Sequence, residues 1–181
     1  MPKYFFTSDP HFNHTNIIEY SKRPFGSLNE MNKKIIENWN QRVKREDIGI
    51  IVGDFMFRSK DFTFEYFNDK LRGNKIFLRG NHDLNNGVKT KITSMVLYHS
   101  KQEIFITHRP QDFSNKYAIN LVGHVHEKWL IKKIPQGKNR EVILYNVGVD
   151  MHNFYPVTLD ECLQDIQRIR LKKDIDSIQY F

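Results

Sequence analysis

The sequence predicts an α/β fold whose core is one large sheet system or two sheets packed together. Strand-like and helix-like segments alternate in the first half of the chain, as in a β-α-β-α-β unit. The second half consists mostly of short apolar runs separated by brief polar breaks, which favours strands. An alternating half followed by a run of strands is typical of layered α/β architecture. Because no repeat or Gly/Pro/Ser-rich linker interrupts the chain, we predict a single domain over residues 1–181.

Three strands and two helices are predicted in the first half. The segment "KYFFTS" at 3–8 indicates a short strand. Ser27 and Glu30 have the spacing of a capping box, which predicts the start of a helix. Apolar residues then recur at steps of three and four, as on one helix face: Leu28, Met31, Ile35, Trp39 and Val43. "DIGIIVG" at 47–53 and "NKIFLRG" at 74–80 predict buried strands, and "SKDFTFEYFNDKL" at 59–71 predicts a helix between them.

The second half predicts two hairpins, a further strand and a final helix. "MVLYHS" and "QEIFITH" are separated by one residue and favour a hairpin, and "YAINLVG" favours another strand. "WLIKKI" and "EVILYNVG" flank "PQGKNR" and predict a second hairpin. Thr158 and Glu161 form another capping box, so we expect a helix through "CLQDIQRIRLKK", which ends at residue 173.

Composition limits the class of protein. The chain is 39% hydrophobic and contains 14 Phe, as expected of a globular domain with a core. No apolar run approaches the roughly 20 residues that span a bilayer, and the N-terminus lacks a signal-peptide core, so we expect a cytoplasmic protein without a membrane partner. The single cysteine, Cys162, excludes an internal disulfide and a cysteine-bound metal cluster. A net charge of +7 fits an anionic partner, although much of it lies in patches typical of solvated faces.

Polar side chains follow five of the predicted strands. They are Asp9 and His11 after the first strand, Asp54 after the second, Asn81, His82 and Asp83 after the third, His108 after "EIFIT", and His124 and His126 after "INLVG". Buried polar groups without partners cost free energy, so these residues need a common partner. Because binding sites in open α/β sheets are built at the carboxyl ends of strands, we expect them to share one site.

The residue types narrow the chemistry of that site. Seven of these nine residues, which are two Asp, one Asn and four His, offer oxygen and nitrogen ligands without a thiolate. This set suits divalent Mn, Fe, Zn, Co or Ni better than Ca, and among these we expect Mn. Seven ligands exceed the needs of one tetrahedral ion and fit two ions that share a carboxylate. Such a two-metal centre clamps a phosphate and activates a water.

These segments carry a family resemblance. Their order and spacing are Asp9-x-His11, Gly53-Asp54, Gly80-Asn81-His82-Asp83, His108 and Gly123-His124-x-His126. Each piece alone is a weak signal, but the five in order resemble the signature of the calcineurin-like metallophosphoesterases. The opening "SDPHFNHTNII" and the late "NVGVD" resemble the compact bacterial and phage members. The resemblance implies a four-layer αββα sandwich, with two mixed β-sheets flanked by helices.

The resemblance also implies a role for each residue. Asp9, His11 and His126 would hold one metal ion, and Asn81, His108 and His124 the other. Asp54 would bridge the two ions together with a water or hydroxide that attacks phosphorus. His82 would contact the phosphate and protonate the leaving oxygen, and Asp83 would orient His82.

The sequence departs from the family pattern at two places. "GDFMFRS" lacks the further acidic residue that many members carry, and Arg109 and Pro110 follow His108 where many members have Gly-His. These departures keep the metal set and leave the substrate class open. Further candidates for phosphate binding are His14, Arg23, Arg58 and Arg109, since imidazole and guanidinium groups match phosphate oxygens. For His14, capping of the segment "TNIIEY" is the alternative role.

Three interpretations of function follow. The first is a two-metal phosphoesterase that hydrolyses a phosphodiester or phosphomonoester of a small, nucleotide-like substrate. The second is a non-catalytic binding scaffold on the same fold, which the complete ligand set disfavours. The third is a nuclease acting on DNA or RNA, which the basic charge favours. We rank it below small-molecule hydrolysis because the chain shows no extended basic stripe.

Overall fold

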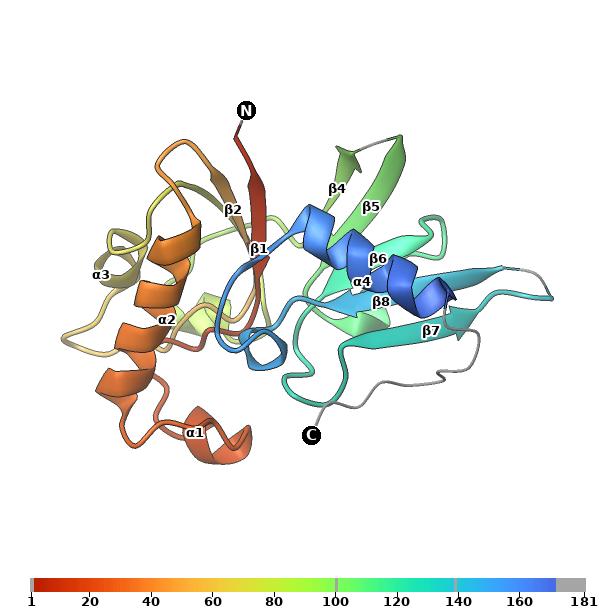
Figure 1. Ribbon diagram of the computed structural model, residues 1–181. Coiled ribbons are helices and arrows are strands. Elements are labelled where there is room, and N and C mark those ends of the chain that lie inside the picture. Colours follow the sequence, from red (N-terminus) through yellow and green to blue (C-terminus); the bar gives the residue numbers. More distant parts are fainter. Residues whose placement is uncertain (1, 100, 139, 172–181) are drawn as a thin grey trace.

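Two mixed β-sheets face each other in the computed structural model, which describes residues 2–99, 101–138 and 140–171 (Figure 1). The first sheet has the order β3-β2-β1-β9. Its strands are β1 (Tyr4–Thr7), β2 (Ile48–Val52), β3 (Asn74–Leu78) and β9 (Val157–Thr158). The first three are parallel, and β9 pairs antiparallel with β1. The predicted strands of the first half are therefore confirmed, whereas β9 was not predicted.

The second sheet has the order β4-β5-β6-β8-β7. Its strands are β4 (Ser94–His99), β5 (Gln102–Thr107), β6 (Ile119–Val122), β7 (Ile131–Pro135) and β8 (Glu141–Asn146). Strands β4 and β5 form one antiparallel hairpin, and β7 and β8 form the other, as the sequence predicts. The inner strands β5, β6 and β8 run parallel.

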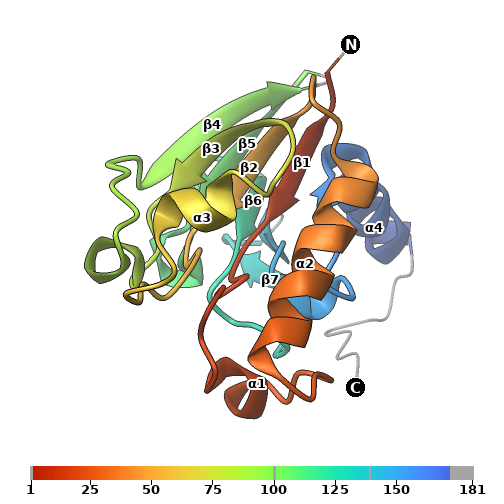
Figure 2. The same cartoon turned by 90° about the vertical axis from the view of Figure 1, so that its left-hand side faces the viewer.

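Three helices pack with the outer face of the first sheet, and the first of them lies beyond the carboxyl ends of its strands (Figures 1 and 2). They are α1 (Ile17–Tyr20), α2 (Leu28–Arg42) and α3 (Phe64–Asn68). Helix α2 begins where predicted, because Ser27 accepts a hydrogen bond from the Glu30 main-chain nitrogen. Alternate residues of β1 point to opposite faces, so Phe5 packs in the helix cluster and Phe6 in the cluster between the sheets.

The predicted helix over 59–71 is wrong in its length. Only Phe64–Asn68 is helical, and Thr63 caps it by accepting from the Tyr66 main-chain nitrogen. The preceding residues instead form a turn in which the Ser59 hydroxyl accepts from the Phe62 main-chain nitrogen. A local side-chain hydrogen bond of this kind competes with helix formation.

The main core lies between the sheets and includes the final helix, α4 (Leu159–Leu171). Thr158 and Glu161 make the reciprocal bonds of a capping box, which confirms the predicted helix start. Cys162 is fully buried in this cluster, as expected of a core residue. The last two residues of the predicted helix, 172 and 173, lie outside the described residues.

The two-sheet architecture flanked by helices is confirmed, and it places the strand ends together. Parallel pairing aligns the carboxyl ends of β1, β2 and β3 in one sheet and of β5, β6 and β8 in the other. Three short 3-10 helices follow strand ends: η1 (Asp83–Asn86), η2 (Pro110–Asp112) and η3 (Val149–Met151). Among the described residues, none of the helices has the length and hydropathy of a bilayer-spanning segment.

The packing of α2 on β2 generates a stability prediction. A Cβ atom added at Gly49 would overlap the Trp39 ring, whose Nε1 is fixed by donating to the Arg72 carbonyl at 2.9 Å. Gly49→Ala should therefore lower the free energy of unfolding by about 1–3 kcal/mol, the usual cost of overpacking. Denaturant titration measures the loss, with Gly26→Ala, whose added Cβ only touches Glu30, as the control. Equal stability of the two variants would contradict this packing.

Candidate metal centre

Six of the predicted ligands form two groups at the carboxyl ends of the strands. The first group is Asp9, His11 and His126, and the second is Asp54, His108 and His124. Within each group the ligand atoms lie within 4.8 Å of one another. The groups draw on strands of both sheets, so neither sheet alone could supply either of them.

Five of these six residues have left-handed backbone conformations. They are Asp9 (φ 56), His11 (φ 49), Asp54 (φ 52), His124 (φ 72) and His126 (φ 50). Non-glycine residues rarely adopt this region, and such strain gathers at functional sites. The sharp turns aim the side chains back toward a common centre. Close approach also requires glycine at position 80, because a Cβ there would overlap Asp54.

The first group contains buried polar atoms without partners. Asp9 Oδ2 accepts from the His124 main-chain nitrogen at 2.7 Å, but Asp9 Oδ1 has no hydrogen-bond partner among the described residues. Both ring nitrogens of His11 are likewise buried without a partner there, and Nε2 lies 3.9 Å from Asp9 Oδ1. Burial lowers the pKa of His11 well below its ordinary value, so the imidazole is neutral and has a free lone pair. A divalent cation would satisfy these atoms, so the residues fit a metal site.

His126 is held by a carboxylate that the sequence analysis did not assign. Its Nδ1 lies 3.0 Å from Asp150 Oδ2, so Nδ1–H donates to the carboxylate and Nε2 is left for a metal. Burial lowers the pKa of His126, but the bond to Asp150 raises it above its ordinary value. Asp150 follows β8, so the rule applied to five strand ends, extended to "NVGVD", could have found it.

The proposed phosphate-binding role of Arg23 does not fit the structure. Its guanidinium is buried and donates from Nε and Nη2 to Asp150, at 2.8 and 3.0 Å. It also donates to the main-chain carbonyls of Asp9 and Pro10. With every nitrogen engaged inside the protein, Arg23 braces the first group and does not face a substrate.

Asp54 belongs to the second group and also lies close to the first. Its Oδ2 is 3.3 Å from His108 Nε2 and 3.7 Å from His11 Nε2, one histidine from each group. Burial alone would raise the pKa of Asp54, but the hydrogen bond and charge of His108 hold it below its usual range. An ionised carboxylate in contact with both groups can bridge two ions.

His108 connects the two sheets and is oriented on both sides of its ring. Its Nδ1–H donates to the Val52 carbonyl at 2.8 Å, and Nε2 lies 3.0 Å from Asn81 Oδ1. Asn81 thus joins the second group, where the sequence analysis expected it. Burial lowers the pKa of His108, but the hydrogen bond to Asp54 and the charge of Asp9 raise it to about 9. A metal ion that binds Nε2 therefore displaces a proton, while the Nδ1–H bond can remain.

The predicted partnership between His82 and Asp83 is wrong. Both carboxylate oxygens of the fully buried Asp83 accept main-chain N–H groups, from Gly80 at 2.6 Å, Asp54 at 3.0 Å and Phe55 at 2.9 Å. Asp83 therefore fixes the loops that carry Asp54 and Asn81 and does not orient His82. A buried carboxylate accepts hydrogen bonds from main-chain amides that would otherwise lack a partner. The sequence did not reveal which amides lie close to Asp83.

His82 lies at the edge of the centre. Its side chain is 48% exposed, and its Nε2 lies 4.0 Å from Asp54 Oδ2. Its main-chain nitrogen donates to Asp54 Oδ1 at 2.9 Å, which holds the residue beside the metal groups. The ring lies 5.4 Å from Phe57 and 5.7 Å from His11, measured between ring centroids.

The remaining substrate-binding candidates have different positions. His14 stacks on Phe57 with ring centroids 3.8 Å apart and lies 5.4 Å from His11, so it borders the centre. It does not cap α1, whose N-cap residue is Asn16. Arg109 is exposed, pairs with Asp112 at 2.8 Å and lines a cavity with His108. Arg58 lines a separate cavity that contains none of the metal-binding candidates.

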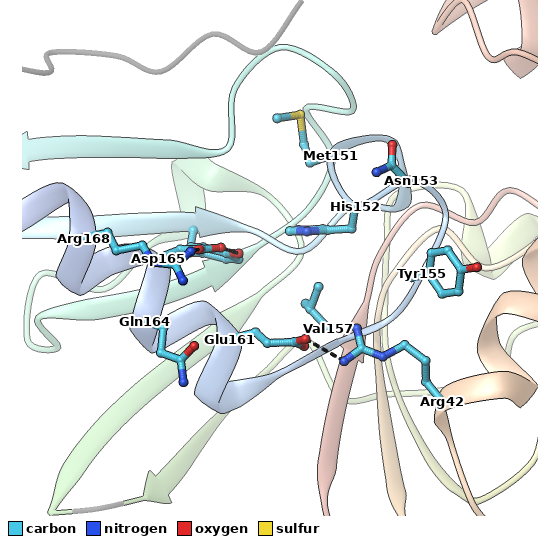
Figure 3. Close-up of a pocket in the computed structure, with 11 residues that line it drawn as sticks. Arg42, Met151, His152, Asn153, Tyr155, Val157, Glu161, Gln164, Asp165 and Arg168 are labelled. Carbon is cyan, nitrogen blue, oxygen red and sulfur yellow. Dashed lines mark hydrogen bonds and ion pairs between the residues drawn. The ribbon is translucent and has the colours of Figure 1, made fainter.

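A different cavity, of about 540 Å³, is drawn in Figure 3. Arg42 from α2 and Glu161 from α4 line it and form an ion pair at 2.7 Å. Arg168 pairs with Asp165 of the same helix at 3.4 Å. The charged side chains of this cavity pair with one another, and none of the candidate metal ligands lines it. The cavity is therefore not the active site.

The Asp83 contacts generate a prediction. Asp83→Ala removes the acceptor for three buried amides, so we expect a loss of about 3 kcal/mol in the free energy of unfolding and weaker metal binding. Denaturant titration and metal analysis measure the two effects, with the exposed Asp61→Ala as the control. Had Asp83 acted only through His82, stability and metal content would stay at wild-type levels.

Comparison with known proteins places this centre in a family. The model of the calcineurin-like phosphoesterases matches residues 2–176. An uncharacterized protein of Methanocaldococcus jannaschii, MJ1445, is 33% identical over 184 residues, which cover 98% of this chain and 99% of that protein. The crystal structure of AQ665 from Aquifex aeolicus, a protein of unknown function, aligns with a TM-score of 0.68 and 20% identity. The alignment covers 92% of this chain and 100% of the AQ665 chain, so the two proteins have the same fold.

The family match spans almost the whole chain, and the two candidate metal-ligand groups lie where five strand ends of the two sheets meet. The chain belongs to the calcineurin-like phosphoesterase family.

Proposed function

We propose that this protein is a metal-dependent phosphodiesterase that acts on small, nucleotide-like substrates, with Mn²⁺ as the preferred ion. One observation carries the proposal. Asp54, a member of the second ligand group, also lies close to the first, and buried atoms of Asp9 and His11 have no hydrogen-bond partner among the described residues. A structural hydrogen-bond network would leave fewer such atoms unsatisfied.

The side chains of the site would have two roles, which are binding of the metal ions and protonation of the leaving group. Two bound ions would supply Lewis-acid stabilisation of the phosphate and a nucleophilic water at neutral pH. The first ion would be held by Asp9, His11 and His126, and the second ion by Asn81, His108 and His124. Asp54 would bind both ions. Asp150 sets the His126 tautomer, and Val52 sets that of His108. His82, which is half exposed beside Asp54, would give a proton to the leaving oxygen.

An open site favours diesters. In the described part of the chain no separate domain covers the strand ends, and a cavity of about 350 Å³ adjoins the second ligand group. This volume is at the lower end of small-ligand sites. A diester with a nucleoside or a small alcohol on either side of phosphorus fits such a site, and cyclic nucleotides are included.

Two other functions remain as alternatives. A non-catalytic scaffold would need no ordered set of ligands, so the complete groups oppose it. A nuclease is favoured by the net charge of +7. A steep salt dependence of polynucleotide binding would support the nuclease, because binding to a strand releases counterions.

A substrate panel tests the proposed function. Metal-free protein loaded with Mn²⁺ would be assayed on bis(p-nitrophenyl) phosphate, p-nitrophenyl phosphate, cyclic nucleotides and dinucleotides. We expect metal-dependent hydrolysis that is faster on diesters. Activity confined to the monoester would contradict the diester preference, and no activity on any ester would support the scaffold.

The bridging role of Asp54 predicts the effect of one substitution. Asp54→Asn should reduce the bound metal from two ions and abolish turnover, since an amide bridges two cations poorly, while the protein stays folded. Metal analysis, bis(p-nitrophenyl) phosphate hydrolysis and circular dichroism measure these effects, with Asp61→Asn as the matched control. Full metal content and normal turnover in Asp54→Asn would refute the bridge.

The role of His82 predicts a dependence on the leaving group. A general acid contributes about 10²–10⁴-fold to rates, and it matters most when the leaving group is a poor one. His82→Ala should keep both ions, lose much activity on an alkyl or ribose ester, and lose far less on a nitrophenyl ester. The ratio of wild-type to variant rates on the two esters decides the matter. An equal loss on both leaves His82 only a phosphate-binding role, and a lost ion makes it a ligand.

A further inference from the structure

A groove adjoins the second ligand group at the point where the two sheets meet. It lies between the end of β3 and the β4–β5 hairpin and has a volume of about 350 Å³. We call it the arginine groove, and its defining residues are Arg79, Asn81, Ser94, Phe105, His108 and Arg109. Two of these, Asn81 and His108, belong to the second ligand group, so anything bound in the groove lies next to the reacting phosphate.

Two arginines flank this groove, one from each sheet. Arg79 directly precedes the Gly80-Asn81 loop, and Arg109 directly follows His108. The main-chain nitrogen of Arg79 donates to the Ile92 carbonyl at 2.7 Å, which holds this residue at the end of β3. Both arginines are therefore placed by the same strand ends that place the metal ligands.

The charge of the groove is not neutralised by its own residues. Arg79 is half buried, yet its guanidinium has no ion pair or hydrogen bond within the described part of the chain. Arg109 gives its Nε to Asp112 at 2.8 Å, and its terminal nitrogens remain. Asp112 is the one acidic side chain in the lining, so Arg79, Arg109 and Asp112 together carry a net charge of +1. An unpaired guanidinium fork suits a phosphate group.

The rest of the lining suits a nucleoside. Ser94 and Thr107 contribute hydroxyl groups, while Leu84 and Phe105 contribute apolar surface. Phe105 stacks on Tyr117 with ring centroids 5.5 Å apart and an angle of 7°, which holds the Phe105 ring in place. Side chains of this kind provide hydrogen bonds to a sugar and a flat apolar contact for a base.

We propose that the arginine groove binds a second phosphate, carried by the nucleoside that flanks the scissile phosphodiester. The inference rests on the proposed phosphodiesterase function and narrows its substrate class. The substrate is then an acyclic nucleotide diester with a further phosphate, such as the phosphorylated end of an oligonucleotide. Hydrolysis adds water across one P–O bond of the diester, and the second phosphate is bound without being transformed. A cyclic nucleotide has no such group.

Dinucleotides with and without the second phosphate test the inference. Mn²⁺-loaded protein would be assayed on ApA, on pApA and on ApAp, so that both positions of the extra phosphate are sampled. We expect at least one phosphorylated dinucleotide to exceed ApA in kcat/KM by about tenfold, as charge-assisted hydrogen bonds allow. Arg79→Met and Arg109→Met should each remove most of this advantage, mainly through KM.

The control is Arg45→Met. Arg45 is exposed and precedes β2, so it lies at the end of this strand that is opposite to Asp54 and the metal centre. It should keep the full preference for the second phosphate, and thermal unfolding would confirm that all variants fold. Equal kcat/KM on the three dinucleotides, or a preference unchanged in both groove variants, overturns the inference.

A binding measurement separates this inference from the proposed function. Adenosine 3′,5′-bisphosphate would be titrated calorimetrically into wild-type, Arg79→Met and Arg109→Met proteins. If no ester is hydrolysed, the phosphodiesterase proposal fails, and the inference about its substrate fails with it. If bis(p-nitrophenyl) phosphate is hydrolysed but the arginine variants bind the bisphosphate as tightly as wild type, only the groove inference fails.

Discussion

The contacts between Asp54, His108 and Val52 join the two sheets at the end where the candidate metal centre lies. His108 follows a strand of the second sheet, yet its ring is held by the Val52 carbonyl and the Asp54 carboxylate of the first. Asp9 makes the reverse connection, because it accepts from the His124 main-chain nitrogen at 2.7 Å. The distances within each ligand group therefore depend on how the two sheets pack. A change in that packing would move the members of both groups apart.

The polar residues of the centre are supported by a second set of buried polar residues. Asp83 accepts three main-chain amides, and Asp150 connects His126 to Arg23. Five ligand residues have left-handed conformations that an isolated loop would rarely adopt, and these contacts fix three of them, namely Asp54 through Asp83, His126 through Asp150, and Asp9 through Arg23. Free energy from the core between the sheets offsets this strain, although atoms of the centre remain partly unsatisfied.

The arginines near the metal centre differ in whether they have partners within the protein. Arg23 is enclosed and satisfied, whereas Arg79 keeps a guanidinium without a partner among the described residues, and Arg109 is exposed. A buried arginine with carboxylate and carbonyl partners organises the protein, while an unpaired one beside a phosphate-binding centre is available to a ligand. From the sequence alone, Arg23 and Arg109 were equal candidates for phosphate binding, and Arg79 was not among the candidates.

The sequence by itself determined the strands, the two hairpins, the caps of α2 and α4, and the set of residues that meet at the strand ends. These follow from local periodicity and from the shared edge of parallel strands, which need no knowledge of distant partners. The two-residue strand β9 escaped prediction because it forms only by pairing with β1. Likewise, only the tertiary structure decided the roles of Asp83, Asp150 and Arg23. Arg23 and Asp150 are 127 residues apart, and the choice of a hydrogen-bond partner over that separation depends on packing that no local pattern encodes.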